Sequence, residues 1–319
     1  MTGAWPTVGR LAPSPTGLLH PGHASSFALA WLSARSKGGA IHLRLEDIDD
    51  SRCKTNHFAT IEEDLTWLGI DWDKAPLIQT GRLNAHREAL ENLKAQETVY
   101  PCTCSRADID RAASAPQAGD SAVGLQRHYP GTCSGRSSME AAGLQARGIP
   151  FCWRLREPPH GWPGFQDGLR GPVNGTIAER EGDFIVWRAA KGNQSGGPSY
   201  QLAVVVDDGF QQVTEVVRGE DLLDSTPRQI ALMRLLGIQI PTYIHVPLLV
   251  DMDGRRLAKR AGSLSLAHLR KRGDRPEYVM GKLAQLWGIN PSGGPVVLSD
   301  LVPGFDWGKI TPGPWVWRL

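Results

Sequence analysis

Residues 7–35 have the sequence TVGRLAPSPTGLLHPGHASSFALAWLSAR, which divides into three parts. The first part, 7–12, is a short apolar run that predicts a buried strand, and 13–17 is a turn rich in proline. An apolar-periodic run over about 21–35 then predicts a helix. A strand, a turn containing glycine and a helix in this order are typical of the first unit of a nucleotide-binding fold.

The segments that follow continue the alternation of strands and helices. Residues 41–47 (IHLRLED) alternate as a strand that ends in carboxylates, and helical spacing appears over 58–70 and 84–97. Further along, QLAVVVDD (201–208) is a nearly continuous β-branched run, which predicts a central strand buried on both faces. This order of elements predicts an α/β fold, a Rossmann-like doubly wound parallel sheet with helices on both faces.

The remaining elements of the predicted sheet come later in the chain. Residues 211–223 (QQVTEVVRGEDLL) predict a strand and a turn, and the helix after them is expected to start with Ser225 as its N-cap and to stop at Gly237. YIHVPLLV (243–250) is the next predicted strand, and one clear helix is expected near 276–288.

Composition divides the chain into four regions. Cys, Pro, Gly, Ser and Ala dominate the sequence from position 100 to about 148, which departs from the α/β pattern. We therefore predict an inserted subdomain at 99–195 between two halves of the catalytic sheet, 1–98 and 196–250. Residues 251–319 are assigned to a basic loop and a short, mainly helical C-terminal region.

The overall composition is that of an ordinary globular protein. The chain has 319 residues, of which 41% are hydrophobic and 21% charged, so a disordered or fibrous protein is excluded. We find neither a run of about 18 apolar residues nor the pattern of a signal peptide, and we expect a cytoplasmic protein. The formal net charge of +2 means that nucleic-acid contact would depend on local patches. No heptad pattern is evident, so we expect a monomer.

A first group of residues that could carry chemistry lies between the first predicted strand and helix. Pro13, His20, Gly22 and His23 stand where a helix start offers unpaired N–H groups to a phosphate, and Gly22 lets a polyanion approach the backbone. Two histidines three residues apart can hydrogen-bond nucleotide phosphates and stabilise charge on a leaving group. The alternative is that the prolines only shape the start of the helix and the histidines are solvated.

A second group is the loop DGRRLAKRAG (253–262), in which Lys259 could reach a triphosphate as a flexible point charge. Residues 251–275 contain eight Lys and Arg against three Asp, a balance that would also suit an RNA backbone. The alternative is a solvated basic loop without a ligand.

Three of the five cysteines crowd into one short stretch, as Cys102, Cys104 and Cys133. Three thiolates suit tetrahedral Zn²⁺, which needs a fourth ligand. Reduced structural thiols are the alternative. Cys53 and Cys152 have no partner in the sequence pattern, and we expect them to be ordinary thiols.

Three ordered motifs together resemble the signatures of class I aminoacyl-tRNA synthetases of the glutamyl group. They are RLAPSPTGLLHPGH (10–23), RLEDID (44–49) and VVRGEDLL (216–223), and the basic loop 253–262 follows them. The resemblance extends to about Ser265. Full-length members continue past this loop with domains that read the anticodon, so the chain is similar to the truncated paralogues that lack an anticodon-binding domain.

The resemblance implies an ATP-dependent ligase with Mg²⁺ that activates L-glutamate to glutamyl-adenylate without tRNA. Glutamate would then be transferred to the queuosine cyclopentenediol at the wobble position of tRNA(Asp). In this family His20, His23 and Lys259 would act on ATP, and Pro13 and Gly22 would complete the ATP site.

Glutamate recognition needs cationic clamps for two carboxylates and an anion for the ammonium group. By their place in the resembling motifs, Arg10 and Arg218 are the expected guanidinium forks and Glu46 is the expected ammonium partner. Tyr200 aligns with a tyrosine that contacts the amino acid in this family, and Ser14 is expected to add a hydrogen bond. The resemblance does not assign one carboxylate to each arginine.

The family also has a zinc site in which a tyrosine oxygen completes a set of thiolates. This resemblance implies Cys102, Cys104, Tyr129 and Cys133 as ligands of one structural Zn²⁺ that holds the insertion together. His128 is the rival fourth ligand, because histidine is chemically the commoner one.

The chain departs from the family pattern at two positions. Pro21 stands where an aliphatic residue is usual, and Ala258 stands where the basic-loop signature has serine. Loss of one hydroxyl predicts a modest rate effect of about 1 kcal/mol. Three alternatives stay open: a truncated glutamyl-tRNA synthetase that charges tRNA(Glu), a non-catalytic paralogue that binds tRNA or adenylate, and a zinc-dependent RNA-binding module.

Overall fold

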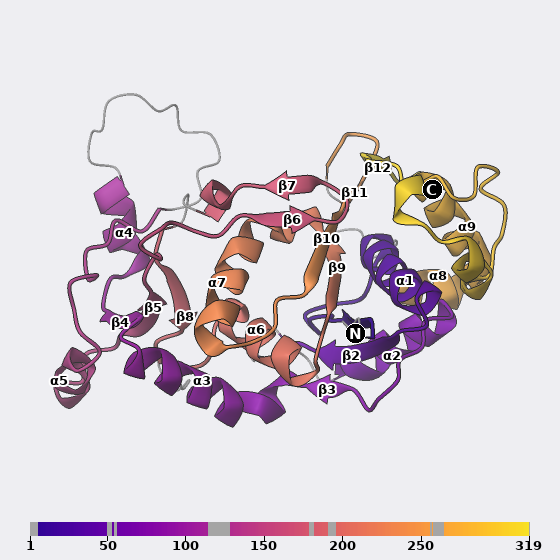
Figure 1. The fold of residues 1–319 in the computed structure, drawn as a ribbon. Coiled ribbons are helices and arrows are strands. Elements are labelled where there is room, and N and C mark those ends of the chain that lie inside the picture. Colours follow the sequence, from indigo (N-terminus) through magenta and orange to yellow (C-terminus); the bar gives the residue numbers. More distant parts are fainter. Residues whose placement is uncertain are drawn as a thin grey trace.

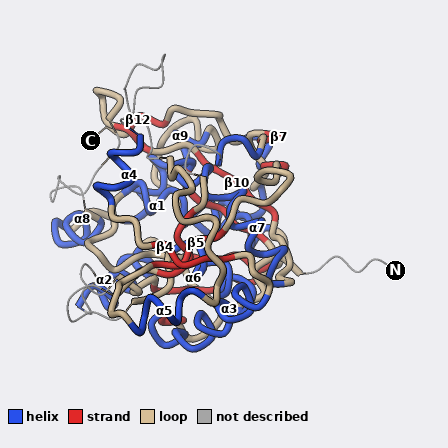
Figure 2. Tube along the Cα trace, turned by 90° about the vertical axis from the view of Figure 1, so that its left-hand side faces the viewer, coloured by secondary structure: helices blue, strands red, loops and turns tan. Residues whose placement is uncertain are grey.

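The structure is a computed structural model that describes residues 6–49, 53, 56–113, 128–178, 182–190, 196–255, 257 and 265–318. Figure 1 shows an elongated molecule with the β4, β5 and β8 strands at one end, the central strands in the middle and the C-terminal elements at the other end. In the view of Figure 2 the helices lie mostly outside the strands. Every described helix is too short or too polar to cross a lipid bilayer.

Parallel strands form the centre of the molecule. One sheet has the order β1-β2-β3 and a second has the order β7-β6-β10-β9. Strands β1 and β9 are in contact, and the amide of Thr214 donates to the carbonyl of Val8 at 2.9 Å, so the two sheets adjoin. The bounds are β1 Val8–Leu11, β2 Ala40–Leu45, β3 Leu77–Ile78, β6 Phe165–Asp167, β7 Gly171–Val173, β9 Glu215–Gly219 and β10 Thr242–Val246. Apart from the antiparallel β6–β7 hairpin, the paired strands are parallel, as predicted for a doubly wound sheet.

Helices connect and cover these strands, and most of these helices lie where the sequence predicts them. Helix α1 begins with Pro21, whose fixed backbone suits the first helical position, and it contacts both β1 and β9. Helix α7 ends at Leu236, and Gly237, where the helix was expected to stop, caps it in the left-handed conformation. The bounds are α1 Pro21–Ser36, α2 Asn56–Trp67, α3 Leu83–Ala95, α6 Tyr200–Phe210, α7 Thr226–Leu236, α8 Leu266–Arg272 and α9 Pro276–Trp287.

The prediction of a central strand at 201–208 is wrong, because these residues belong to helix α6. Ser199 caps the helix by accepting a hydrogen bond from the amide of Leu202, and the apolar side chains pack against α3 and α7. An apolar run of this length fits a buried helix as well as a buried strand, and packing rather than β-propensity decides between them.

Two smaller expectations also differ from the structure. The predicted strand 243–250 is divided into β10 and β11 (Leu249–Val250) around Pro247, which has no N–H to donate to a sheet. Ser225 precedes α7 as expected, but it makes no side-chain cap and instead accepts a hydrogen bond from Gln201.

The segment after α3 forms an antiparallel sheet of its own, β4-β5-β8. Its elements are β4 Val99–Cys102, α4 Arg106–Ala113, α5 Glu140–Ala146, β5 Cys152–Leu155 and β8 Phe184–Trp187. A second hydrophobic core joins this sheet to the surrounding helices: Leu155 and Val186 lie in one cluster with Leu90 of α3, Leu202 of α6 and Leu232 of α7. The segment therefore shares its core with the helices that flank it in sequence.

The C-terminal elements are fastened to α1 and to the strand before the basic loop. The indole N–H groups of Trp287 and Trp307 donate to Ser25 and Ser33 of α1, each at 2.9 Å. Strand β12 (Trp315–Val316) pairs in parallel with β11. The C-terminal region thus belongs to the same core as α1.

Candidate active site

The predicted nucleotide and glutamate residues that the structure describes meet around one cavity of about 420 Å³. Its walls come from the β1–α1 connection, the end of β2, the start of α6, strand β9 and the turn after β10. The predicted residues among its lining are Arg10, Pro13, Ser14, His20, Gly22, His23, Glu46, Tyr200 and Arg218. Lys259 and Ala258 lie outside the described residues, and Leu257 lines the cavity. The cavity lies beside β1 and β9, where the two parallel sheets adjoin, and nucleotides commonly bind at such a junction in doubly wound folds.

His20 and His23 form the first turn of α1 and cap each other. The ring Nδ1 of His20 accepts from the amide of Gly22 at 3.1 Å, and Nδ1 of His23 accepts from the amide of His20 at 3.2 Å. The ring centroids are 3.8 Å apart. Because Nδ1 acts as the acceptor in both neutral rings, the proton of each ring is on Nε2. Both histidines are therefore donors through Nε2.

Gly22 has a local reason to be glycine. A Cβ at this position would lie 2.8 Å from Cε1 and 3.0 Å from Nδ1 of His20. A separation of 2.8 Å is too short for two carbon atoms that are not bonded. The missing side chain therefore makes room for the His20 ring.

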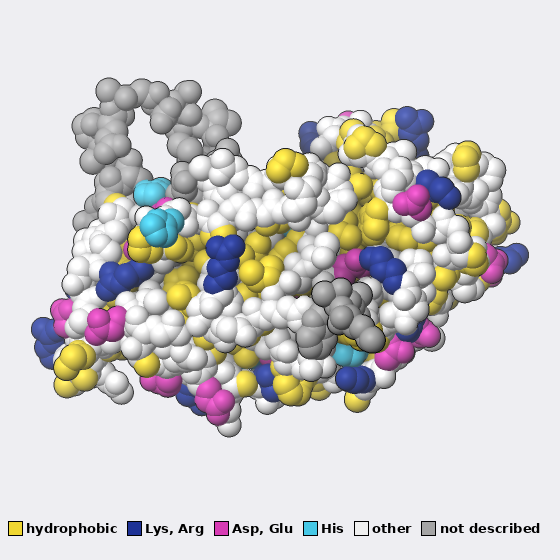
Figure 3. Space-filling model, in the orientation of Figure 1, with side chains coloured by type: hydrophobic (Ala, Val, Ile, Leu, Met, Phe, Trp, Pro, Cys, Tyr) yellow, Lys and Arg dark blue, Asp and Glu magenta, His cyan; other side chains and the backbone are white. Residues whose placement is uncertain are grey.

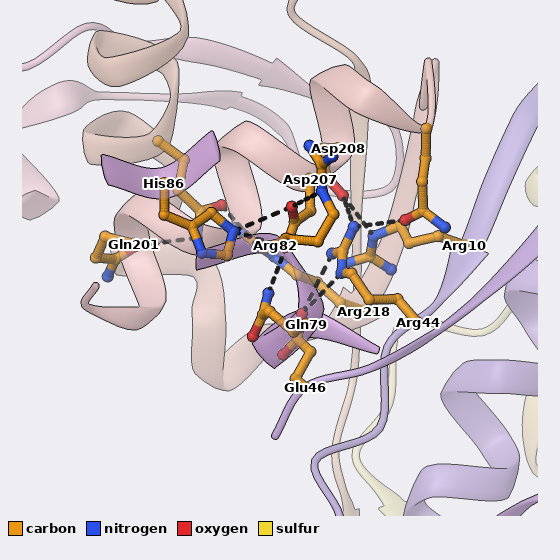
Figure 4. A network of polar contacts seen from close by, with 12 residues as sticks. Arg10, Arg44, Glu46, Gln79, Arg82, His86, Gln201, Asp207, Asp208 and Arg218 are labelled. Atoms are coloured by element: carbon orange, nitrogen blue, oxygen red, sulfur yellow. Dashed lines mark hydrogen bonds and ion pairs between the residues drawn. The ribbon is translucent and has the colours of Figure 1, made fainter. Parts of the chain in front are cut away.

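Two arginines and two carboxylates form a buried network beside the cavity (Figure 4). Arg44 donates to Asp208 at 2.7 Å and to Glu46 at 3.2 Å and 3.3 Å. Arg10 donates to the carbonyl of Val217 at 3.1 Å, and its Nε lies 3.9 Å from the same Asp208 oxygen. The four charged side chains are at most 7% exposed, so each positive charge needs the nearby carboxylates.

Burial and charge oppose each other in this network. Burial disfavours the charged guanidinium of Arg44, but Asp208 and Glu46 overcome it and raise the pKa of Arg44 above its ordinary value. For Arg10, burial dominates and lowers the pKa. Burial also raises the pKa of Glu46 against the opposing effect of Arg44 and Arg10. Two of these four charges, on Arg44 and Asp208, were not predicted as site residues.

Arg218 is buried on β9 among neutral acceptors. Its Nε donates to Nε2 of His245 at 3.0 Å, Nη1 donates to Gln229 at 2.8 Å, and Nη2 donates to Thr226 at 2.7 Å and to the carbonyl of Leu222 at 3.3 Å. Among the described residues, none of its hydrogen-bond partners is an acid. Arg218 is 4% exposed, so it is a buried cation whose described hydrogen-bond partners carry no negative charge.

Ser14 and Tyr200 complete the lining from two other directions. The amide of Glu46 donates to the carbonyl of Pro13 at 3.0 Å, which fixes the turn that carries Ser14 against the end of β2. Tyr200 is the first residue of α6, and burial raises the pKa of its hydroxyl. The helix start that was predicted as a strand therefore places Tyr200 at the cavity.

A second buried network, centred on the carboxylate of Asp207, lies beside the first, to its left in Figure 4. Asp207 accepts from Gln79 at 2.9 Å and from Arg82 at 3.1 Å, and both of its oxygens are 3.1 Å from Nε2 of His86. None of these residues lines the cavity. They join α6 to α3 and to the short 3-10 turn before it.

The thiols predicted to bind metal come together at the end of strand β4. The Sγ atoms of Cys102, Cys104 and Cys133 all lie within 4.8 Å of one another. The hydroxyl of Tyr129 is 3.3 Å from Cys102 and 3.7 Å from Cys104, and it accepts from the amide of Cys133 at 2.9 Å. Tyr129 is buried, whereas the side chain of His128 is exposed. The predicted fourth ligand thus lies among the thiols.

Cys152, predicted to be an ordinary thiol, lies beside the three clustered thiols. It pairs with Cys102 across β4 and β5, and a hydrogen bond from Cys152, aided by Tyr129 and Arg154, lowers the pKa of the Cys102 thiol below its ordinary value. The thiolate is the form of cysteine that binds metal. The side chain of Arg154 also lies over the Tyr129 ring, with Cζ 3.8 Å from the ring centroid.

The surface around these sites has mixed charge. On the face shown in Figure 3, apolar side chains gather across the middle of the molecule, and basic and acidic side chains are interspersed among the described residues. This distribution agrees with the small net charge of +2.

Comparison with known proteins finds relatives that belong to one family. Residues 7–299 match the family model described as tRNA synthetases class I (E and Q), catalytic domain. The chain is 44% identical over 302 residues to the glutamyl-Q tRNA(Asp) synthetase of Nitratidesulfovibrio vulgaris, which covers 92% of this chain and 90% of that protein. It is 43% identical over 314 residues to the protein of the same name from Symbiobacterium thermophilum, with coverage of 96% and 94%.

More distant relatives are longer than this chain. The glutamate–tRNA ligase of Nitrosomonas europaea is 35% identical over 305 residues, which are 96% of this chain but 63% of that protein. A crystal structure of a glutamate tRNA ligase from Elizabethkingia meningosepticum superposes with a TM-score of 0.80 at 24% identity, over 98% of this chain and 67% of that one. This likeness shows that the fold is the one predicted.

Proposed function

We propose that this chain, which belongs to the class I tRNA synthetases (E and Q) and among them to the glutamyl-Q tRNA(Asp) synthetases, is a glutamate-activating ligase. In the reaction, glutamate is activated by ATP without tRNA, and the glutamyl group is transferred to the queuosine cyclopentenediol of tRNA(Asp). The observation that carries the proposal is that the predicted nucleotide and glutamate residues that the structure describes line one cavity. It joins the histidine pair of the β1–α1 connection to Arg10, Glu46 and Arg218, which come from three different strands or strand ends.

The glutamate half of the cavity has the charges that an amino acid with two carboxylates requires. Arg218 has only neutral acceptors among the described residues, so a substrate carboxylate would supply its first anionic partner. Arg10 is the second fork, and Glu46 beside it takes the ammonium group. Ser14 and Tyr200 add hydrogen bonds from the turn and from the start of α6.

The ATP half is built on the start of α1. Pro13 and Gly22 shape the loop, and Nε2–H groups of His20 and His23 donate to phosphate oxygens. Lys259 adds a positive charge to the triphosphate, and Ala258 is expected to cost little because the lysine is retained. Mg²⁺ would supply further neutralisation of the phosphates when bound.

The chemistry is two successive substitutions. An oxygen of the glutamate carboxylate attacks the α-phosphate of ATP, a new P–O bond forms, and pyrophosphate leaves with the electrons of the broken P–O bond. A hydroxyl of the cyclopentenediol then attacks the acyl carbon of the adenylate, loses its proton, and AMP leaves. The task of the protein in both steps is to position the groups and to stabilise negative charge.

The zinc proposal is supported by the donor set. Three thiols and the Tyr129 hydroxyl lie close together, and they supply four donors, the number that structural Zn²⁺ takes, of which three are thiols. Zinc would hold the β4-β5-β8 sheet together. We further propose that 99–195 is the acceptor-binding insertion, between catalytic halves 1–98 and 196–250 and a C-terminal region 251–319. The monomeric state and the cytoplasmic location stay predictions.

The test is a comparison of acceptors with purified protein. Glutamate-dependent exchange between ATP and pyrophosphate in the absence of tRNA is the expected first result. Labelled glutamate should then attach to tRNA(Asp) that contains queuosine, including a form that lacks the 3′-terminal adenosine, and should not attach to tRNA(Asp) with guanosine at the wobble position. Attachment to the 3′ end of tRNA(Glu) would instead favour a truncated glutamyl-tRNA synthetase, and no exchange would favour a non-catalytic paralogue.

A further inference from the structure

A line of three buried side chains runs from the β6–β7 hairpin to the glutamate half of the cavity. Asp167, at the end of β6, accepts from Nδ1 of His245 at 2.6 Å. Nε2 of His245 in turn accepts from Nε of Arg218 at 3.0 Å. His245 is fully buried on β10, and Arg218 lines the cavity from β9. The sequence motifs singled out Arg218 and neither of the other two residues.

The hydrogen bonds of Asp167 fix the tautomer of His245. One carboxylate oxygen accepts from the backbone amides of Leu169 and Arg170, each at 3.0 Å, and the other accepts from the backbone amide and Nδ1 of His245. An ionised carboxylate can only accept, so Nδ1 must carry the proton. Nε2 therefore presents a lone pair, which is what the Nε–H of Arg218 requires.

A neutral acceptor at this position serves the arginine in a way that an acid would not. Together with Gln229, Thr226 and Leu222, His245 engages the three nitrogens of the guanidinium and sets its plane. An aspartate or glutamate in place of His245 would also hold Arg218, but it would neutralise the charge and compete with a substrate carboxylate. The negative charge of Asp167 is instead one side chain further away.

We propose that His245 and Asp167 are positioning residues for Arg218, which hold its guanidinium in the orientation that binds a glutamate carboxylate while leaving its positive charge uncompensated. This inference rests on the proposed function, in which Arg218 binds glutamate. It also connects the pocket to β6, which lies within the predicted insertion 99–195. Burial lowers the pKa of His245 to about 4, which agrees with a neutral ring at neutral pH.

The first experiment measures ATP–pyrophosphate exchange kinetics of the His245→Phe variant. Phenylalanine keeps an aromatic ring beside Tyr243 and Phe165 and removes the acceptor for Arg218. We expect KM for glutamate to rise about 10- to 100-fold, because Arg218 loses a buried hydrogen bond and its fixed plane. KM for ATP and kcat should change by less than about 3-fold. A KM for glutamate within 2-fold of the original protein would overturn the proposal.

His86→Phe is the matched control, since it removes another fully buried histidine that is bonded to an aspartate, Asp207, outside the cavity. It should lower the thermal midpoint as His245→Phe does and leave KM for glutamate unchanged. An equal rise of this KM in both variants would show a general loss of packing and would overturn the specific role of His245.

The second experiment reads the tautomer directly and needs no activity. Nitrogen NMR of the ring should show His245 as the neutral Nδ1–H form. In the Asp167→Asn variant, the amides of Leu169 and Arg170 keep the oxygen of the new side-chain amide on their side. The NH₂ group of the asparagine then faces Nδ1 of His245. The proton of the His245 ring should therefore move to Nε2, where it opposes the Nε–H of Arg218. An Nε2–H tautomer in the unmodified protein would overturn the proposal. Absence of glutamate-dependent exchange in the unmodified protein would instead refute the proposed function, and the NMR result would still stand on its own.

Discussion

Asp208→Asn tests whether the buried charge network beside the cavity serves the site or only the fold. The carboxylate of Asp208 is 4% exposed, and it is 2.7 Å from Nη1 of the fully buried Arg44 and 3.9 Å from Nε of Arg10. Two positive charges, on Arg10 and Arg44, are balanced by Asp208 and Glu46. The substitution removes one negative charge of this balance without changing the shape of the side chain.

The size of the effect follows from burial. Breaking a buried ion pair by removing one partner costs about 3–5 kcal/mol, because the remaining charge is left in a medium of low polarity. The amide oxygen of the new asparagine can still accept from Arg44, so we expect the low end, about 3 kcal/mol. For a chain of 319 residues that loss lowers the thermal midpoint by about 4–5 °C. The freed Arg10 and Arg44 should also compete for Glu46 and raise KM for glutamate about 10-fold.

The neighbouring residue provides the control, because Asp207→Asn makes the same chemical change on the same helix. Asp207 is fully buried and belongs to the network of His86, Arg82 and Gln79, which does not line the cavity. We expect a comparable fall of the thermal midpoint and no change in KM for glutamate. The assays are thermal unfolding by tryptophan fluorescence and ATP–pyrophosphate exchange. A KM that rises equally in both variants, or in neither, would refute the idea that Asp208 supports the glutamate half of the cavity through Arg10 and Arg44.

Three further perturbations probe the other parts of the site. Gly22→Ala places a Cβ 2.8 Å from Cε1 of His20 and should displace that ring. We expect kcat/KM for ATP to fall about 10-fold in exchange assays. An unchanged value would show that the position of the ring does not matter for ATP. Cys104→Ser should reduce the zinc content measured by atomic absorption and impair glutamate transfer to tRNA while exchange persists, and full zinc retention would contradict the ligand set. Because the pKa of His245 is lowered from 6.5 to about 4 in the folded protein, the unfolded chain binds the proton first, and stability should fall by up to about 3 kcal/mol as pH drops from 6.5 to 4. His245→Phe should flatten the stability curve in that range, as measured by urea unfolding at each pH, and an unchanged slope would contradict a buried neutral histidine.

The sequence predicted the site best where a short motif contains both turn residues and side chains that can bind a ligand. PSPTG, His20, Pro21 and Gly22 predict a strand, a turn and a helix start, and the structure has β1, the turn and α1 at those positions. Residues from each of the motifs at 10–23, 44–49 and 216–223 line one cavity because each motif follows or ends a parallel strand. Parallel strands bring such ends to the same edge of a sheet.

The residues that support the site were not predictable in the same way. Arg44 stands in the strand pattern IHLRLED, where a single charge between apolar residues is the only hint of a buried ion pair. Its partner Asp208 is 164 positions away in the chain, and Asp167 is 78 positions from His245. Such pairs depend on the packing of elements far apart in sequence, which no local pattern encodes.

The error at 201–208 bears directly on how the site is built. In a strand, the side chains of Asp207 and Asp208 would point to opposite faces of the sheet. In helix α6 their side chains diverge by only about a third of a turn, so both remain buried while they contact different elements. Asp208 reaches Arg10 and Arg44 on β1 and β2, and Asp207 reaches His86 on α3. One helix turn therefore joins the glutamate half of the cavity to the helix that leads into the β4-β5-β8 sheet, and a helix was needed at this place for both networks to close.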